Sequence, residues 1–480
     1  MSITLIQNVL ALQGENLAPV DVQIADRFIR SVASAGTISP NSAQQIIAGK
    51  DKLLLPGFAN AHTHSSQVWQ RGLIPQLPLE LWLADVFDST PTELDRFYWG
   101  AVSTAVDTLL SGGTCLLDHA YIIPGKERET VAALVRGYRQ VGMRAVIAPL
   151  IQDMPFSAGF LQSDRLPPSQ YPVPAAETLA IMEALIQEFH DPANGIYIGL
   201  GPTGFHRCSD ALLQGCMELC DRYDLCYHTH LLETRNQKKL AYERYGCSGV
   251  KHLHRLGCLD RRTSLAHGVW LEDEDIDLLA TTGASLVHNP VSNLRLGSGL
   301  APILKCVRAG VNVAFGCDGA ASNDAQNLLE VIKLSTLLHN ISDSDYRHWL
   351  TPTQTIAMAA AGGVKALGLS RTEDDSEASF TGSISTGMEA DMVLYDLNHP
   401  SLLPCIDPLR ALVLGRPTDV VEAVWVKGKP VVAEGEVKTI NLNDLYQTLR
   451  RGAPLARHFH FQQIQRFEAH YRDTTDFEPA

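Results

Sequence analysis

Apolar residues follow two different patterns along this chain. In the first fifty-odd residues, runs such as ITLIQNVLAL and VDVQIADRFIRSVA are separated by Gly, Asn and Pro, a pattern typical of short strands. From Lys52 onward, short continuous apolar runs alternate with longer segments of helical period, which indicates a parallel sheet with crossover helices. Strand-like alternation returns in ADMVLYDL and VEAVWVKGKPVVAEGE, where a Gly-Lys-Pro turn predicts a hairpin.

The middle of the chain contains eight apolar runs that we predict to be parallel strands. They are LLLPGFANAH, TCLLDHA, RAVIAPL, YIGLGPT, CYHTHL, SLAHGV, ASLVHN and NVAFGCDG, with amphipathic stretches such as DALLQGCMELCDRYD and LAPILKCVRAG between them. Eight parallel strands joined by right-handed crossovers predict a (β/α)8 barrel of the TIM type. We therefore expect an α/β fold in which the barrel spans residues 56–385.

The chain ends are expected to form smaller parts. Residues 1–55 and 386–445 are predicted to build one small β-sandwich domain, and residues 446–480 a C-terminal helical extension. The acidic segment RTEDDSEASFTGS is predicted to be a solvated loop.

Composition narrows the range of partners. The 480 residues are 45% hydrophobic and 19% charged, as in ordinary globular enzymes, and carry a formal charge of −14, which disfavours nucleic acid and anionic membranes. The sequence lacks a basic leader and any run of eighteen apolar residues, so we expect a cytoplasmic protein. The ten cysteines have no CxxC spacing and are expected to be buried apolar residues, without a disulfide framework.

Polar residues gather at the carboxyl ends of the predicted strands. The stretch PGFANAHTHSSQ places two histidines two residues apart, on one face of a strand. Chemistry in a (β/α)8 barrel takes place at these strand ends, and imidazoles with a carboxylate suit zinc or ferrous iron. The alternative is a set of purely structural or solvated side chains. The strand-end residues are His62, His64, His228, His230, His267, His288 and Asp318.

Glu233 is a candidate general acid/base. It follows His230 by three residues, just beyond a predicted strand end, where it could face a metal-bound water whose pKa the ion lowers to about 7. The alternative role is that of a glutamate in the first turn of a helix, stabilised by the helix dipole.

Five motifs, PGFANAHTH, HTHLLE, AHGVWL, HNPVSNLRLGSG and CDGAASND, resemble those of the amidohydrolase superfamily, in its ATZ/TRZ and cytosine-deaminase-like branch. The resemblance extends over nearly the whole chain. It implies that Glu233 moves protons, that His267 binds the attacking water or the substrate and stabilises the developing oxygen, and that Asp318 takes the water proton. By the same resemblance, the metal ligands are His62, His64, His230 and Asp318. His228 is left out of the set because it has the wrong phase if His230 points inward, unless both point inward as His62 and His64 do.

A single divalent ion, Zn²⁺ or Fe²⁺, is expected. Binuclear members of the superfamily bridge their metals with a modified lysine at the end of strand four, and the run YIGLGPT has no lysine. The only lysine between His64 and His230 is Lys126, in a polar loop.

The resemblance implies an aminohydrolase that releases ammonia from an N-heterocycle. RGLIPQLPLELWL is similar to deaminases of S-adenosylhomocysteine and methylthioadenosine, but those enzymes carry a histidine after strand four where this chain has Pro202 and Thr203. That segment and CDGAASND look closer to triazine hydrolases and 8-oxoguanine-type deaminases. We therefore expect a free purine- or pterin-like substrate. The alternatives are a nucleoside deaminase, a triazine-type hydrolase that expels chloride or alkylamine, and a non-catalytic member.

Five further residues are weaker candidates for substrate binding. Arg71 binds the substrate or forms an ion pair, while His288 and Asn289 contact the substrate, shape the pocket or support Asp318. The complete set is Arg71, Trp82, Thr203, His288 and Asn289. The expected partner is a small heterocycle, and the resemblance implies a homo-oligomer.

Overall fold

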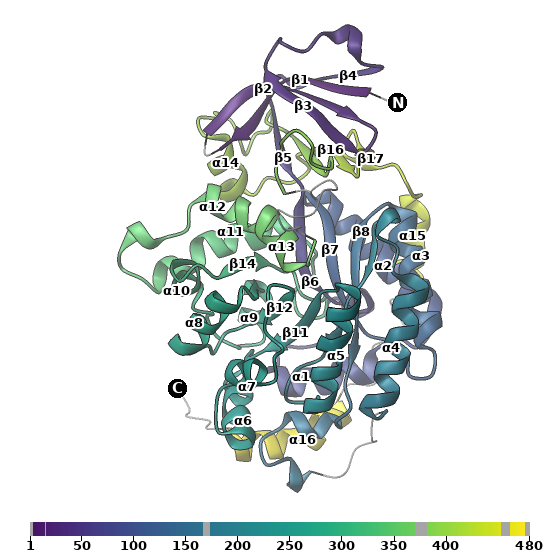
Figure 1. Ribbon diagram of the computed structural model, residues 1–480, viewed down its shortest axis with the longest axis vertical. Coiled ribbons are helices and arrows are strands. Elements are labelled where there is room, and N and C mark those ends of the chain that lie inside the picture. The colour runs from purple at the N-terminus through teal and green to yellow at the C-terminus, as the bar shows by residue number, and fades with distance from the viewer. Residues whose placement is uncertain (1–2, 15, 167–172, 370–381, 453–460, 476–480) are drawn as a thin grey trace.

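The computed structural model describes residues 3–14, 16–166, 173–369, 382–452 and 461–475. The molecule is elongated, with a strand-rich part at one end and α16 (Phe461–Thr474) at the other (Figure 1). Most of the acidic segment predicted to be a loop, up to residue 381, lies outside the described residues.

Both ends of the chain contribute to a nine-stranded sheet. Its order is β18-β17-β16-β15-β5-β1-β2-β3, with β4 paired to β1. The antiparallel pair β5–β15, in which Pro56 lies opposite Met392, joins the two ends of the chain. The strands are β1 (Ile3–Gln13), β2 (Asn16–Ala25), β3 (Phe28–Ser34), β4 (Gln45–Ala48), β5 (Lys52–Pro56), β15 (Met392–Asp396), β16 (Val421–Val426), β17 (Lys429–Ala433) and β18 (Glu436–Val437). The proposed sandwich form and the domain boundaries stay predictions.

The hairpin β16–β17 turns one residue earlier than its sequence suggested. Lys427 and Gly428 both have positive φ, 53° and 72°, as a two-residue type I′ turn requires. Lys429 and Pro430 already belong to β17, where they pair with Val426 and Trp425.

All eight predicted runs contain strands of two parallel sheets. One sheet has the order β10-β8-β7-β6, with β9 beside β8, and the other has the order β11-β12-β13-β14. A parallel bridge between Leu200 and Tyr227 connects the sheets on one side, and on the other side the Asp318 N–H donates to the His62 carbonyl at 2.9 Å. The strands are β6 (Phe58–Thr63), β7 (Gly113–Ala120), β8 (Arg144–Ile151), β9 (Ile196–Ile198), β10 (Gly201–Pro202), β11 (Tyr227–Leu231), β12 (Thr263–His267), β13 (Ser285–His288) and β14 (Asn312–Phe315).

The first apolar run passes from one sheet into another. It is divided at Gly57 into β5, in the nine-stranded sheet, and β6, in a parallel sheet. A Cβ atom at Gly57 would lie only 2.1 Å from the Thr114 hydroxyl, so glycine is required where the chain crosses β7.

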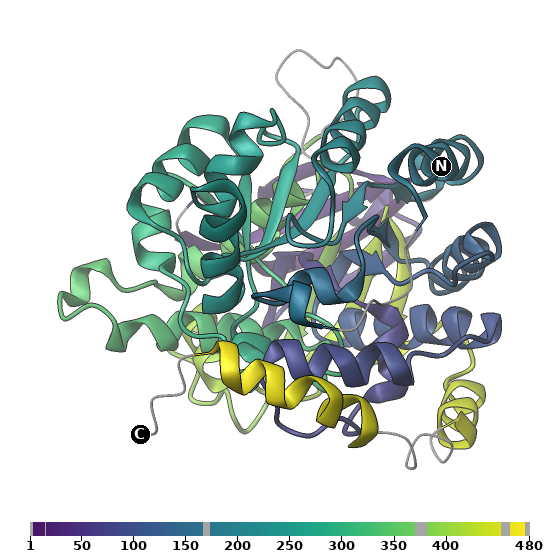
Figure 2. The same cartoon turned by 90° about the horizontal axis from the view of Figure 1, so that it is seen from below.

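Helices surround the parallel strands (Figures 1 and 2). The two amphipathic stretches singled out in the sequence are α5 and α10, although α10 is shorter than its pattern. The helices besides α16 are α1 (Leu79–Ser89), α2 (Leu94–Leu110), α3 (Glu127–Val141), α4 (Ala175–Phe189), α5 (Asp210–Tyr223), α6 (Arg235–Tyr245), α7 (Gly249–Arg255), α8 (Asp273–Thr282), α9 (Pro290–Arg295), α10 (Ile303–Arg308), α11 (Leu328–Leu338), α12 (Pro352–Ala357), α13 (Gly363–Ala366), α14 (Pro408–Gly415) and α15 (Leu442–Gly452). Among the described helices, none has the length and apolar character needed to cross a membrane.

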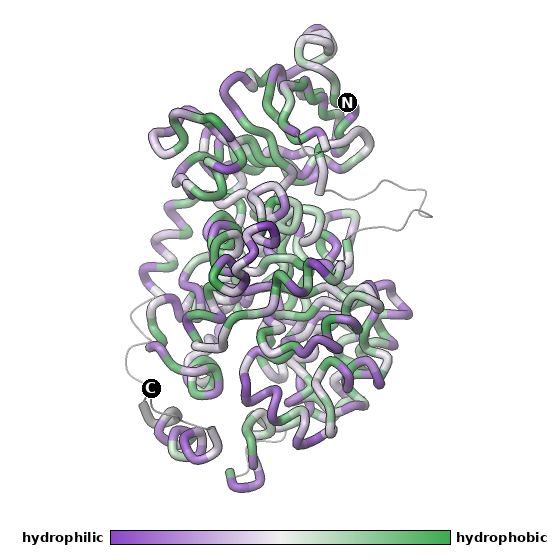
Figure 3. The backbone as a smooth tube through the Cα atoms, turned by 90° about the vertical axis from the view of Figure 1, so that its left-hand side faces the viewer, coloured by the Kyte–Doolittle hydropathy of each residue, from purple (hydrophilic) through white to green (hydrophobic). Residues whose placement is uncertain are grey.

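Two apolar cores and a buried ion pair hold the parts together. A large core surrounds the parallel strands, and a second one lies within the nine-stranded sheet. Apolar and polar stretches alternate along the chain in both parts (Figure 3). At the amino end of β8, the buried Arg144 pairs with Asp391 at 2.9 Å and with Glu389 at 2.5 Å, next to β15. The nine-stranded sheet therefore lies at the amino ends of the strands and leaves their carboxyl ends open for a site.

The C-terminal helix α16 lies along α1 (Figure 2). Phe467 of α16 is buried in a cluster with Leu81, Ala84 and Phe160. Since α1 follows the first pair of histidines, α16 backs an element at the carboxyl ends of the strands.

Candidate active site

Four side chains at the strand ends bring their ligand atoms together. His62 is in β6, His64 follows it, His230 is in β11, and Asp318 follows β14. The Asp318 Oδ1 atom lies 3.5 Å from His62 Nε2 and 3.4 Å from His64 Nε2, and His230 Nε2 lies 3.3 Å from His64 Nε2. Atoms bound to one tetrahedral ion at roughly 2.0–2.1 Å would lie about 3.3 Å apart. This spacing therefore fits one divalent ion.

Hydrogen bonds fix the tautomers of two of these histidines. His64 Nδ1 donates to the His119 carbonyl at 2.6 Å, and His230 Nδ1 donates to the Thr203 carbonyl at 2.8 Å. With the proton held on Nδ1, each Nε2 lone pair is directed toward the neighbouring ligands.

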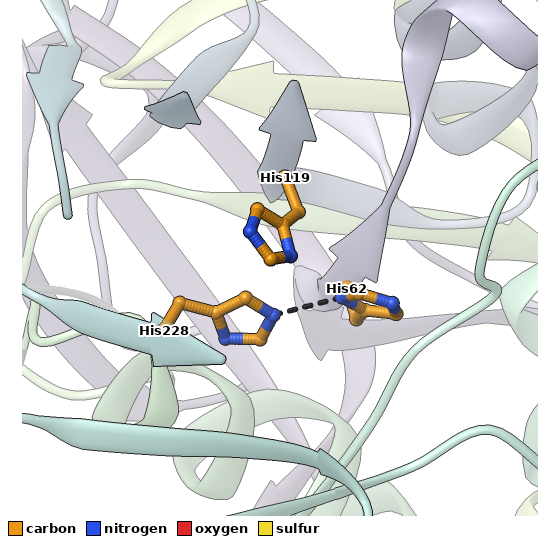
Figure 4. Close-up of side chains that lie close together, drawn as sticks. All are labelled: His62, His119 and His228. Carbon is orange, nitrogen blue, oxygen red and sulfur yellow. Dashed lines mark hydrogen bonds between the residues drawn. The ribbon is translucent and has the colours of Figure 1, made fainter. Parts of the chain in front are cut away.

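His62 is oriented by a second layer of histidines. His62, His119 and His228 point toward one another from β6, β7 and β11 (Figure 4). His228 Nε2 lies 2.8 Å from His62 Nδ1, and His228 Nδ1 lies 3.0 Å from the Ser264 hydroxyl. His62 Nε2 is buried and has no hydrogen-bond partner among the described residues, as expected of an atom reserved for a metal.

The charge states of these groups suit metal binding. Burial lowers the pKa of His62 to about 4 and holds the pKa of His230 well below the ordinary range, so both imidazoles are neutral at pH 7. Burial opposes ionisation of Asp318, but the interactions with His62 and the other surrounding imidazoles outweigh it and hold the pKa of Asp318 well below its usual value. Neutral imidazoles and an ionised carboxylate are the forms that bind a metal.

Two of the strand-end residues have left-handed backbone angles. The φ angle is +76° at His267 and +62° at Asp318, which is uncommon for residues other than glycine. Such strained positions often occur at functional sites, where the surrounding structure holds them.

Glu233 lies in the cavity, ahead of α6 and not within it. It is 3% exposed, and its Oε2 atom lies 3.7 Å from His267 Nε2. Thr234 caps α6, so Glu233 is not a first-turn residue. Burial, followed by the charges of Asp318 and Glu80, raises the pKa of Glu233 well above the ordinary range, which favours its protonated form.

His267 is held by an amide. Its Nδ1 atom donates to Asn293 Oδ1 at 2.9 Å, so Nε2 carries the lone pair and faces Asp318 Oδ2 at 4.0 Å. His267 therefore presents an acceptor between Glu233 and Asp318.

The cavity has a polar end and an apolar wall. Trp82 and Thr203, two of the weaker candidates, line it. The polar side chains of the lining include His64, His206, Arg207, His230, Glu233, His267 and Asp318; the apolar ones are mainly Leu79, Trp82, Leu83, Val86 and Phe87 of α1, with Tyr121, Leu150 and Leu296.

The other three weaker candidates are not part of this lining. Arg71 pairs with Asp107 at 3.1 Å, which is the ion-pair alternative named for it. His288 Nε2 faces His339 Nε2 at 3.1 Å, and the Asn289 amide donates to the Val287 carbonyl at 3.4 Å.

The position of Lys126, away from the end of strand four, fits a site with a single ion rather than two ions bridged by a lysine. Lys126 is exposed at the start of α3, whereas the segment at the end of strand four presents Thr203 to the cavity.

Sequence reasoning missed several residues of the site. His228 was set aside because of its phase, yet residues two apart on a strand share a face, so HTH at 228–230 carries the same signal as HTH at 62–64. His119 also ends an apolar run and could have been found in that way. No periodic pattern marks Asn293, His206 or Arg207.

Comparisons with known proteins agree with this geometry. The amidohydrolase family matches residues 53–431, most of the chain. The chain is 33% identical over 437 residues to the 5-methylthioadenosine/S-adenosylhomocysteine deaminase of Thermococcus sibiricus, which covers 89% of this chain and 93% of that protein.

Two solved structures are similar in fold. A triazine hydrolase from Arthrobacter aurescens has a TM-score of 0.85 at 25% identity, covering 95% of this chain and 100% of that one. An adenosine deaminase from Xanthomonas campestris with bound zinc has a TM-score of 0.82 at 26% identity, covering 95% and 99%. The chain described here belongs to the amidohydrolase family and is a hydrolase of carbon–nitrogen bonds, a deaminase.

Proposed function

We propose that this enzyme hydrolytically removes the amino group of an adenine nucleoside of the methylthioadenosine or S-adenosylhomocysteine type. The position of Glu233, buried in the cavity that His64, His230 and Asp318 also line and 3.7 Å from His267, is the observation that carries deamination. The relatives' names support a nucleoside over the free purine or pterin that the sequence favoured.

The deaminases of S-adenosylhomocysteine and methylthioadenosine carry a histidine after strand four, where this chain has Thr203. His206, three residues beyond Thr203, lines the same cavity. The segment thus still offers an imidazole to a substrate. Burial holds the pKa of His206 well below its ordinary value, so that imidazole is neutral.

The proposed roles follow from the proton positions. A divalent ion held by His62, His64, His230 and Asp318 would supply hydroxide at neutral pH, because it lowers the pKa of a water to about 7. Glu233, whose raised pKa favours the protonated form, donates a proton to the ring nitrogen beside the amine and so makes the ring carbon electrophilic. Asp318, which is ionised, accepts the proton of the water. His267 orients that water by accepting its hydrogen bond at Nε2. Asp318 then passes the proton to the departing amine, so that the carbon–nitrogen bond breaks and ammonia leaves.

Several finer expectations join this proposal. Zinc is the proposed ion, with ferrous iron as the alternative, and the two parallel sheets are proposed to be halves of one (β/α)8 barrel. A small-molecule substrate, a homo-oligomer and a cytoplasmic location are also proposed. The ten cysteines, none of which forms a disulfide, fit that location.

Ammonia release from a panel of substrates tests the proposal. We expect zinc-loaded protein to deaminate methylthioadenosine or S-adenosylhomocysteine with a kcat/KM at least tenfold above that for adenine, guanine and a pterin. Faster turnover of a free base would restore the first expectation. Release of chloride from a chlorotriazine without release of ammonia from nucleosides would favour a triazine hydrolase.

A further inference from the structure

An arginine without a partner lies in the cavity wall. Arg207 is 4% exposed, and among the described residues its guanidinium group has neither an ion pair nor a hydrogen bond; its Nε atom is fully buried. Guanidinium is always charged in proteins and carries five N–H donors. A buried charge that lacks a partner is costly, so this position calls for an anionic ligand.

Two aromatic rings hold this guanidinium in place. Its central carbon lies 5.6 Å from the ring centre of Phe87 in α1 and 5.6 Å from that of Phe156. Phe156 in turn packs edge-on against Phe160 and against Phe467 of α16, each at 5.5 Å between ring centres. These aromatic contacts use none of the guanidinium N–H donors, which stay available to a ligand.

The charges around Arg207 favour a ligand with one negative charge. Burial lowers the pKa of Arg207 to about 10, so it stays positive at neutral pH. The carboxyl groups whose charges act on Arg207 are those of Glu233 and Glu80, and burial raises the pKa of both. Glu80 already accepts a hydrogen bond from the Thr234 hydroxyl at 2.8 Å. A dianionic phosphate would place two negative charges near the acidic side chains of Glu233 and Glu80. A carboxylate carries one negative charge, which balances the single positive charge of the guanidinium.

We propose that Arg207 binds a carboxylate at the end of the substrate that is not deaminated. The enzyme then prefers a carboxylate-bearing adenosine thioether, such as S-adenosylhomocysteine, over an uncharged one such as methylthioadenosine. This inference rests on the proposed function and adds to it the charge of the substrate. The apolar wall formed by α1 lines the same cavity as Arg207 and suits the thioether portion.

Substrate variants test the inference on the unaltered enzyme. The compounds are S-adenosylhomocysteine, its decarboxylated analogue, methylthioadenosine and adenosine 5′-monophosphate, each measured for ammonia release. We expect S-adenosylhomocysteine to exceed the other three in kcat/KM by roughly 10- to 150-fold, the value of a hydrogen bond to a charged group. Equal turnover without the carboxylate would overturn the inference, and preference for the monophosphate would assign Arg207 to phosphate. Absence of ammonia from every compound would refute the proposed function instead.

Two variants of Arg207 complete the test. Arg207→Met keeps the length of the side chain without its charge and should lower kcat/KM for S-adenosylhomocysteine at least tenfold more than for methylthioadenosine. Arg207→Lys should recover part of that difference. Equal losses for both substrates, with a shifted pH profile, would show that Arg207 acts on Glu233 and would overturn the inference. If Arg207→Met does not fold, the substrate series on the unaltered enzyme still decides.

Discussion

The Nδ1 atom of His62 lies 2.8 Å from the Nε2 atom of His228, and both imidazoles are completely buried. When His62 donates this hydrogen bond, His228 donates from its own Nδ1 to the Ser264 hydroxyl, 3.0 Å away. That arrangement leaves His62 Nε2 without a proton, facing Asp318 at 3.5 Å. A histidine outside the proposed ligand set thus fixes the tautomer of a ligand.

Replacing His228 should weaken metal binding. His228→Phe keeps the ring volume but removes the acceptor of the His62 proton, and we expect the Kd for zinc to rise about 10- to 100-fold. Competition with a chromophoric chelator measures it. His252→Phe is the matched control, because this buried histidine pairs with Asp210 on α5, away from the site, and should leave the Kd unchanged. An unchanged Kd in His228→Phe would mean that His62 needs no orienting partner.

Replacing Glu233 should separate metal binding from catalysis. Glu233→Gln keeps the shape of the side chain and removes its acid group, so the protein should retain its zinc while kcat falls roughly 10²- to 10⁴-fold. Metal content and steady-state ammonia release are measured on the same sample. Glu243→Gln, on the exposed face of α6, should behave like the unaltered enzyme. A nearly normal kcat in Glu233→Gln would leave Glu233 with a structural role only.

The buried ion pair below the parallel strands should matter for stability. Asp391→Ala removes one of the two carboxylates that pair with the buried Arg144, and we expect the free energy of unfolding to fall by about 3–5 kcal/mol. Urea denaturation measures the change. The control Asp273→Ala breaks an exposed pair with Lys305 and should have little effect. Similar losses in the two variants would contradict a special role for the buried pair.

Acid should destabilise the fold through buried neutral histidines. Burial lowers the pKa of His339 to about 4, from an ordinary value of 6.5. Between these two values the unfolded chain binds a proton that the folded protein does not, so stability falls as the pH decreases from 6.5 toward 4, and the effect is absent above 6.5. His339→Gln should therefore lose less stability than the unaltered protein between pH 7 and pH 5, by on the order of 2 kcal/mol. Parallel losses in urea denaturation at the two pH values would refute this account.

The sequence predicted which side chains come together at the strand ends, because the end of an apolar run can be recognised from the sequence alone. A histidine that closes an apolar run lies at a strand end, and the ends of parallel strands meet at one edge. Partners that depend on neighbouring strands were not predictable in this way. The His228–Ser264 contact joins β11 to β12, and Asn293 reaches His267 from α9.

The division of the first apolar run and the loop that holds His206 and Arg207 could not be predicted for the same reason. The first apolar run is continuous in sequence, and its division at Gly57 depends on the approach of Thr114, which no local pattern reveals. His206 and Arg207 lie in an irregular loop between β10 and α5, where neither helical nor strand periodicity applies. The relatives' names favour the nucleoside over the free base, and the expectation of a free base had considered only Thr203 in that loop.

Titration of metal-free protein with zinc tests the central claim most directly. The claim is that one ion, held by three histidines and Asp318, supports deamination of an adenine nucleoside. Ammonia release from S-adenosylhomocysteine and methylthioadenosine is followed while zinc is added to the apoprotein. The account predicts that activity rises in proportion to added zinc and stops rising at about one equivalent per chain. A rise that continues to two equivalents, or zinc-loaded protein that releases no ammonia from either nucleoside, would contradict it.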